Sequence, residues 1–235
     1  MKLTPRLLTI AKLIPQNTVV ADIGTDHAYI PVYLIKNKIA KRVIAADVNN
    51  GPLQSAQKNI ALHHMENYIE TRLGNGLEIL HPGEVDTVII AGMGGLLIRD
   101  ILTAHPAITS SIDTFVLQPM VAQDDLRRWL LNNGFMIVNE GLVKEDHRIY
   151  EVMVVKKGIQ SVIDDIYYEL GEKLIENNDP LLIEFIRKHL KKYNEILSQL
   201  AGQNSEIANE KRNMCLQKVE KLEEVLSCLN NVKQS

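Results

Sequence analysis

The stretch Val19–Tyr29 constrains the fold of this chain more than any other part of it. It reads as a buried apolar strand, a tight turn at Gly24 and the start of a helix, which is the layout of a nucleotide-cofactor loop. Asp26 stands where a dinucleotide fingerprint has its second glycine. A carboxylate there would repel a pyrophosphate, whereas a cationic cofactor without phosphates would tolerate it. The sequence therefore favours S-adenosylmethionine, whose sulfonium is positively charged.

Residues 1–158 alternate short apolar runs with helical stretches. Because the runs show no polar alternation, they predict strands buried on both faces, in a parallel α/β sheet with helices on either side. The expected strands are Val19–Ile23, Val43–Ala46, Ile69–Leu73, Thr87–Ala91 and Thr114–Leu117, and the expected helices include Pro52–Leu62, Leu96–Ala104 and Ala122–Asn133.

The end of this region predicts a different connection. Phe135–Leu142 and Tyr150–Lys156 both resemble strands, and only the polar segment 143–149 separates them. This gap is too short for a helical crossover, so the two strands must form an antiparallel hairpin. Five parallel strands followed by a hairpin are typical of the Rossmann-like sheet of class I methyltransferases.

Residues 161–235 predict a separate helical domain. A helix over Val162–Glu176 is expected first, with Pro180 near the first position of the next helix. Two long helices should then form an antiparallel hairpin with a coiled-coil seam, joined by a turn at 202–205. The seam residues step by four and three: Leu182, Ile186, Leu190, Tyr193, Leu197 and Leu200, then Cys215, Val219, Leu222, Leu226 and Leu229.

Composition excludes several classes of protein. The chain has no run of about 18 apolar residues, so no membrane partner is expected, and its N-terminus lacks the pattern of a signal peptide. Cys215 and Cys228 have no CxxC or histidine partner, which predicts a reduced cytoplasmic protein without bound metal. The net charge of −3 does not by itself indicate a protein that binds nucleic acid. The sequence leaves the oligomeric state open and slightly favours a monomer.

Polar residues at the ends of successive strands predict a cofactor site. Asp22 ends the first strand, and the amides at the start of the following helix should hold the methionine carboxylate of the cofactor. Asp47 ends the second strand, where an acid can bind both ribose hydroxyls. Asn75 and Gly76 follow the third strand, where the asparagine can accept from the adenine amino group. The alternative for each is an ordinary turn.

The loop Ala91–Gly95, with the sequence Ala-Gly-Met-Gly-Gly, follows the fourth strand. In nucleobase methyltransferases this loop faces the transferred methyl group, and its glycines would let a planar base approach closely. Tight packing of helix on strand is the alternative, although it explains one glycine better than three.

Several segments together resemble the bacterial tRNA (adenine-N1)-methyltransferase family that acts on adenine 22 of tRNA. The resemblance covers residues 1–158, and the helical hairpin resembles the second domain of that family. It implies S-adenosylmethionine-dependent methylation of adenine N1 to 1-methyladenine in tRNA. Asn75 departs from the family, which commonly has aspartate there. The segments that carry the resemblance are Thr4–Leu7 with Arg6, Ala21–Pro31, Asn50–Pro52, Ile90–Gly95, Leu117–Pro119 and Tyr150–Glu151.

The resemblance and the strand-end pattern lead to one set of site residues. The cofactor is assigned to Asp22, Gly24, His27, Asp47, Asn75, Gly76, Ala91, Gly92 and Met93, and the substrate to Arg6, Gly94, Gly95, Gln118, Pro119, Arg127, Lys188, Lys191 and Lys192. Gln118 and Pro119 end the fifth strand and could contact the target base. Arg127 and the lysines belong to local basic clusters, for which a solvated helix face is the alternative.

Asp26 and Tyr29 are the expected catalytic residues. Neutral adenine N1 attacks directly, and the product is cationic until its exocyclic amine loses a proton. Asp26 could orient that amine, stabilise the growing charge or take the proton; its alternative role is to cap the following helix. Tyr29 could stack on a base, or pack in the core. His27 is a weaker candidate.

Two other functions remain open at this stage. A small-molecule methyltransferase would need a lid over its pocket, whereas the sequence offers an open glycine-rich loop. A non-catalytic protein with a methyltransferase fold could bind a partner through the helical hairpin. The presence of Asp22, Asp47 and Asn75 argues against that second alternative.

Overall fold

The computed structural model describes residues 2–232. The chain divides into two compact units, Met1–Ser161 and Val162–Ser235, each with its own secondary structure. None of the helices in the described part of the chain is both long and apolar enough to cross a membrane.

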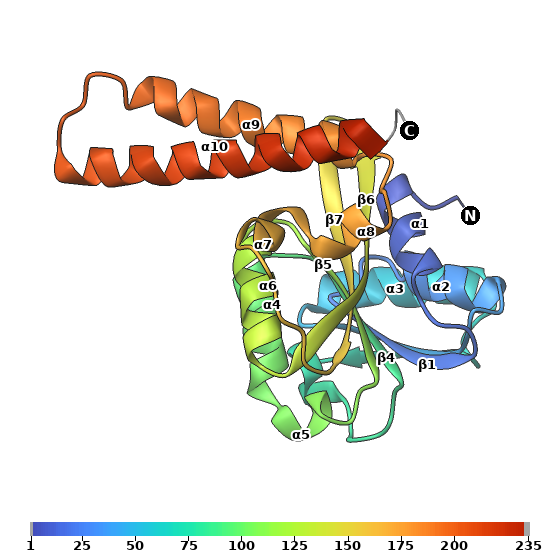
Figure 1. The fold of residues 1–235 in the computed structure, drawn as a ribbon. Coiled ribbons are helices and arrows are strands. Elements are labelled where there is room, and N and C mark those ends of the chain that lie inside the picture. The colour runs from blue at the N-terminus through green and yellow to red at the C-terminus, as the bar shows by residue number, and fades with distance from the viewer. Residues whose placement is uncertain (1, 233–235) are drawn as a thin grey trace. The chain divides into compact units, whose positions relative to one another are not determined.

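The first unit is built on a seven-stranded sheet with the order β3-β2-β1-β4-β5-β7-β6 (Figure 1). The first five strands pair in parallel, while β7 runs antiparallel to both β5 and β6. This is the class I methyltransferase sheet with its terminal hairpin, as predicted. The strands are β1 (Thr18–Ile23), β2 (Ala40–Asp47), β3 (Ile69–Leu73), β4 (Thr87–Met93), β5 (Thr114–Pro119), β6 (Phe135–Glu145) and β7 (Arg148–Lys157).

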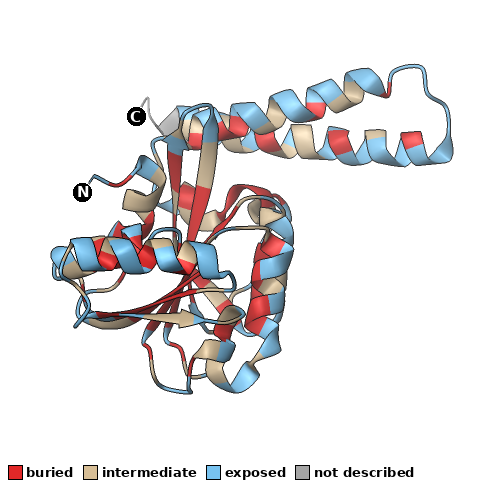
Figure 2. Cartoon of the chain, turned by 180° about the vertical axis from the view of Figure 1, so that it is seen from behind, coloured by how far each residue is buried: buried red, intermediate tan, exposed pale blue. Residues whose placement is uncertain are grey.

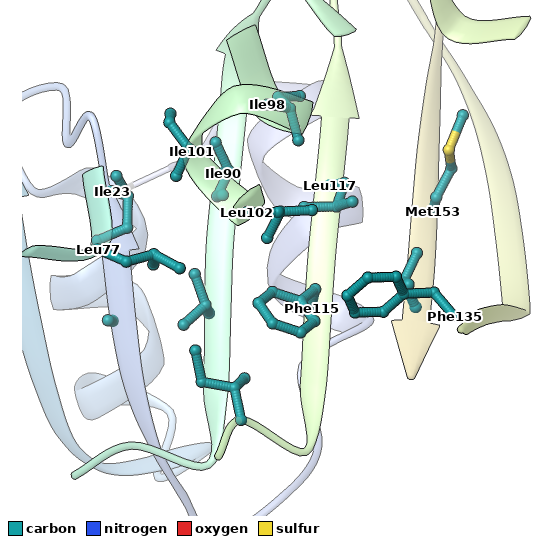
Figure 3. Close-up of a cluster of buried hydrophobic side chains, with 14 of the residues drawn as sticks. Ile23, Leu77, Ile90, Ile98, Ile101, Leu102, Phe115, Leu117, Phe135 and Met153 are labelled. Carbon is teal, nitrogen blue, oxygen red and sulfur yellow. The ribbon is translucent and has the colours of Figure 1, made fainter. Parts of the chain in front are cut away.

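Helices cover both faces of this sheet, because alternate strand residues point to opposite sides. In β4, Val88 and Ile90 belong to one buried cluster and Ile89 to the other. The first cluster lies under α4 and α6, and the second under α1, α2 and α3. Figure 3 shows Ile98, Ile101 and Leu102 of α4 against the strands in the first cluster. Figure 2 shows the buried positions along the strands and on the inner sides of these helices. The helices are α1 (Pro5–Lys12), α2 (Tyr29–Lys36), α3 (Asn50–Leu62), the 3-10 turn η1 (Gly76–Ile79), α4 (Gly95–Ala104), α5 (Pro106–Thr109) and α6 (Gln123–Asn132).

The second unit contains four helices within its described residues: α7 (Ile166–Leu170), α8 (Glu172–Glu176), α9 (Leu182–Gln199) and α10 (Glu206–Val232). The two long helices α9 and α10 pack together. The prediction of one helix over Val162–Glu176 was wrong, because Gly171 adopts a φ of +77° and divides it. Pro180 also lies outside α9, whose N-cap is Leu181.

A polar cluster holds the helices of the second unit together. The hydroxyl of Tyr193 donates to Glu169 over 2.6 Å, and Lys218 pairs with the same carboxylate. Leu182, Ile186 and Leu222 are buried, as the seam pattern predicted. Both cysteines are free thiols.

Candidate active site

The candidate site lies at the carboxyl edge of the sheet, where β1, β2, β4 and β5 end together. The register places Ile23 of β1 beside Ala46 of β2 and Ile90 of β4. Gly24 then turns the chain with a φ of +75°, a conformation that glycine adopts without strain. A Cβ added to Gly24 would stand 2.3 Å from the terminal methyl of Met93, so the Met93 side chain would have to move to admit one.

A cavity of about 270 Å³ opens at this edge. It brings together residues that are far apart in the sequence, from α1, β1, the loop after β1, α2 and β4. Leu7 and Ile30 line it as well; sequence reasoning missed them, since each is one apolar residue of a helix and carries no distinctive signal. The lining residues are Arg6, Leu7, Asp22, Gly24, Asp26, Tyr29, Ile30, Ala91 and Gly92.

Asp22 is a buried carboxyl group that lines this cavity, with only 6 % of its surface exposed. The Thr25 hydroxyl donates to it over 2.7 Å. The pKa of Asp22 is raised to about 6. Burial is the main cause, the Thr25 hydrogen bond opposes it, and the nearby carboxylates Asp26 and Asp47 add to the rise. No cation within residues 2–232 pairs with Asp22, so the site favours a positively charged ligand.

Asp47 ends β2 at the same edge and is partly exposed. Its Oδ1 atom accepts from the Asn49 backbone over 2.7 Å, which fixes the direction of the carboxylate. Asn75 is exposed at the N-cap of η1, and its backbone N–H donates to Glu78. Gly76 has a φ of +57°, with Ile101 close to where its Cβ would be.

The glycines of the segment Ala91–Gly95, at the end of β4, have two different roles. Gly92, with a φ of +78°, is exposed and lines the cavity. Gly95 is buried instead, and a Cβ there would lie 2.2 Å from the Ala122 carbonyl oxygen. Its assignment to the substrate is therefore corrected: Gly95 lets α4 begin against the loop after β5. Gly94 and Met93 remain partly exposed.

Asp26, in the loop before α2, and Tyr29, the first residue of α2, both line the cavity. The Asp26 side chain is 84 % exposed, and α2 has Ala28 at its N-cap with no side-chain cap. The alternative role of Asp26 as a helix cap is thus not seen. Tyr29 is 37 % exposed, which excludes the core-packing alternative. His27 lies beside both residues, with its ring stacked on Tyr29 and its Nε2 atom 3.4 Å from Asp26.

Arg6 is held over the cavity by residues from distant strands. Its guanidinium donates to Gln118 over 2.7 Å and lies 5.5 Å from the centre of the Tyr150 ring, while its backbone N–H donates to Glu145. Gln118 and Pro119 are buried in β5, and the Gln118 amide also donates to the Pro119 carbonyl. Gln118 therefore positions Arg6, and contact of Gln118 or Pro119 with the base stays a prediction.

Arg127 is a further correction. Its side chain is buried and lies between Glu140 of β6 and Glu151 of β7, with hydrogen bonds of 2.8 and 2.6 Å. It therefore ties α6 to the hairpin and presents no charge to RNA. Lys188, Lys191 and Lys192 are exposed on α9, in the second unit, where they can meet a large substrate.

Known proteins resemble this chain over most of its length. The family profile described as tRNA (adenine(22)-N(1))-methyltransferase, TrmK, matches residues 20–224. The Bacillus subtilis (strain 168) tRNA (adenine(22)-N(1))-methyltransferase is 39 % identical over 158 residues, which span 67 % of this chain and 66 % of that protein.

Two solved structures have the same fold over 96 % of this chain. One is a Streptococcus pneumoniae protein in complex with S-adenosyl-L-methionine, with a TM-score of 0.86, 32 % identity and 100 % of that chain covered. The other is M. capricolum TrmK in complex with S-adenosyl-homocysteine, with a TM-score of 0.82, 31 % identity and 100 % of that chain covered. From this match in sequence and fold, the chain belongs to the tRNA (adenine(22)-N(1))-methyltransferase family.

Proposed function

We propose that this protein methylates N1 of adenine 22 in tRNA, with S-adenosylmethionine as the methyl donor. The observation that carries the proposal is the cavity at the carboxyl edge of the sheet, where Asp22, Asp26 and Arg6 meet, in a chain of this family. We expect the reaction in the cytoplasm. The two free thiols agree with a reducing compartment.

The residues present fit the cofactor. Asp22 offers a buried carboxyl group with no cationic partner in the described chain, which suits the ammonium of the methionine moiety. Gly24 is partly exposed and lines the cavity, and Asp47 directs its carboxylate at the edge where a ribose would lie. When bound, S-adenosylmethionine supplies an electrophilic methyl group.

Asp26 and Arg6 act on the target base in this proposal. The adenine must leave its stack to reach the cavity. With S-adenosylmethionine bound, the N1 lone pair of this adenine would attack the methyl carbon as the methyl–sulfur bond breaks and S-adenosylhomocysteine leaves, so positive charge would pass from the sulfonium to the base. Asp26, exposed at the cavity wall, accepts from the exocyclic amine and stabilises that charge. Arg6 faces the same cavity and can meet a phosphate or the ribose of the target nucleotide.

Nucleoside mass spectrometry tests the proposed function directly. An unmodified tRNA transcript incubated with the protein and S-adenosylmethionine should gain one 1-methyladenine, and a transcript with guanine in place of adenine 22 should gain none. The proposal would be contradicted if the transcript with adenine 22 gained no 1-methyladenine, or if both transcripts were methylated equally.

The affinity for S-adenosylmethionine is expected to rise between pH 5 and 7. The raised pKa of Asp22, about 6, means that its carboxyl group is protonated at pH 5 and must lose that proton to face a cation. Affinity should therefore increase by up to about tenfold per pH unit below pH 6 and then level off. Titration calorimetry can measure this, and Asp22→Asn should flatten the profile.

Asp47→Ala should raise the dissociation constant for S-adenosylmethionine at least about tenfold. A charged acceptor that meets two ribose hydroxyls contributes about 1.5–3 kcal/mol. Asp113→Ala, at an exposed position before the amino end of β5, is the matched control and should leave binding unchanged. An Asp47→Ala titration curve that coincides with the control would remove Asp47 from the ribose site.

Replacing Lys188, Lys191 and Lys192 together with alanine should weaken tRNA binding but spare the cofactor site. All three are exposed on α9, and the salt slope of binding should fall by about 0.9 for every phosphate that the variant no longer neutralises. Gel-shift titrations at several salt concentrations measure this slope. Lys41→Ala, at the amino end of β2, is the control. An unchanged slope in the triple variant would favour the alternative that α9 has only a solvated face.

A further inference from the structure

A second pocket of about 350 Å³ lies next to the active-site cavity, and Tyr29 lines both. One wall is His27 with Tyr29. The other is a single face of α3, because its four lining residues follow the spacing i, i+3, i+4, i+7. These residues are Ser55, Lys58, Asn59 and Leu62.

The two rings form an exposed stacking surface. Their centroids are 5.3 Å apart with an angle of 21° between the planes. His27 and Ala28 both adopt the left-handed conformation, with φ of 52°, which is unusual for consecutive residues other than glycine. The Asn59 side chain donates to the His27 carbonyl over 2.7 Å and holds this arrangement from α3. Strained backbone of this kind concentrates at functional sites.

The charges in the second pocket fit a nucleotide. Lys58 is exposed, and no carboxylate among residues 2–232 forms an ion pair with it. The lining of the pocket contains no acidic residue. Leu62, 73 % exposed, adds an apolar edge. Aromatic faces beside a cation are the means by which proteins bind unpaired nucleotides.

We infer that the second pocket binds the nucleotide next to the methylated adenine, an inference that rests on the proposed function. When the target base leaves its stack, its neighbour loses a stacking partner. The His27–Tyr29 rings supply a new one, and Lys58 meets the phosphate of that nucleotide. Because Tyr29 lines both the active-site cavity and the second pocket, two nucleotides that follow each other in the tRNA can occupy them together.

A double-mutant cycle, with one change in the protein and one in the tRNA, tests whether the neighbouring base stacks on the His27–Tyr29 rings. Asparagine tolerates the left-handed conformation, so His27→Asn removes the ring without adding backbone strain. An abasic site on the 5′ or 3′ side of adenine 22 should lower kcat/KM about tenfold with the unaltered protein, and at most about twofold with His27→Asn. If each abasic transcript lowers kcat/KM by the same factor with His27→Asn as with the unaltered protein, the inference is overturned. Matching circular dichroism spectra and thermal unfolding midpoints of the two proteins verify that the variant is folded.

Lys58→Ala gives a second test that does not depend on the ring. It should raise KM for tRNA about five- to tenfold and lower the salt slope by about one, with kcat and cofactor affinity unchanged, while Lys41→Ala should change none of these. An unaltered KM for Lys58→Ala would overturn the phosphate contact. If the unaltered protein methylates no tRNA, the proposed function itself fails; if it does so and both tests are negative, only the role of the second pocket fails.

Discussion

Asp26→Asn is expected to lower turnover on tRNA about 100-fold while changing the affinity for S-adenosylmethionine less than about twofold. The substitution keeps the size of the side chain and removes its charge. Asp26 lines the cavity with its side chain largely in solvent and does not cap α2, so the variant should fold normally. Single-turnover methylation assays with saturating cofactor would measure the effect on the chemical step.

Two results would change the role of Asp26. Turnover close to that of the unaltered protein would leave Asp26 without a part in the reaction. A collapse of cofactor affinity in the same variant would move it into the cofactor site, beside Asp22. Asp125→Asn, at an exposed position of α6, is the matched control and should change neither quantity.

Arg127→Met should lower the free energy of unfolding by about 3–5 kcal/mol. Methionine keeps much of the volume but leaves Glu140 and Glu151 buried without their shared cation. Arg128→Met, at the exposed neighbouring position, should cost less than about 1 kcal/mol. Urea unfolding of the three proteins, followed by circular dichroism, gives the comparison.

The pH dependence of this variant gives an independent check. Burial already raises the pKa of Glu151 in the presence of Arg127. Without the guanidinium, the folded state binds protons more readily than the unfolded state, so the stability of Arg127→Met should recover as the pH falls from 7 toward 5. A deficit that does not change with pH would indicate poorer packing instead of uncompensated charge.

The sheet could be predicted from the sequence because its signals are local. Apolar runs reveal strands buried on both faces, and the short gap 143–149 forces β6 and β7 into a hairpin. The polar residues of the site follow the ends of strands, so Asp22, Gly24 and Asp26 could be assigned to one site from the sequence. All three line the cavity. Glycine at 171 was a local signal too, although the helical spacing around it obscured the break.

The surroundings of a polar side chain could not be predicted in the same way. A basic pair in a helix is the same pattern whether it meets solvent or two glutamates, and Arg127 finds Glu140 and Glu151 only because α6 packs on the hairpin. Gln118 is likewise separated from Arg6 by 112 residues, and their hydrogen bond exists only because the fold brings α1 to the sheet hairpin and the end of β5 within reach of the Arg6 side chain.

Short stretches of chain were thus enough to predict the strands, the hairpin and the acids at the sheet edge, since hydrophobic pattern and turn residues act over a few positions. Burial of the Arg127 guanidinium, the packing of Gly95 against a carbonyl and the set of residues around the cavity arise only when the chain is folded. Each depends on contacts between segments far apart in the sequence, and no local pattern records which segment will lie opposite.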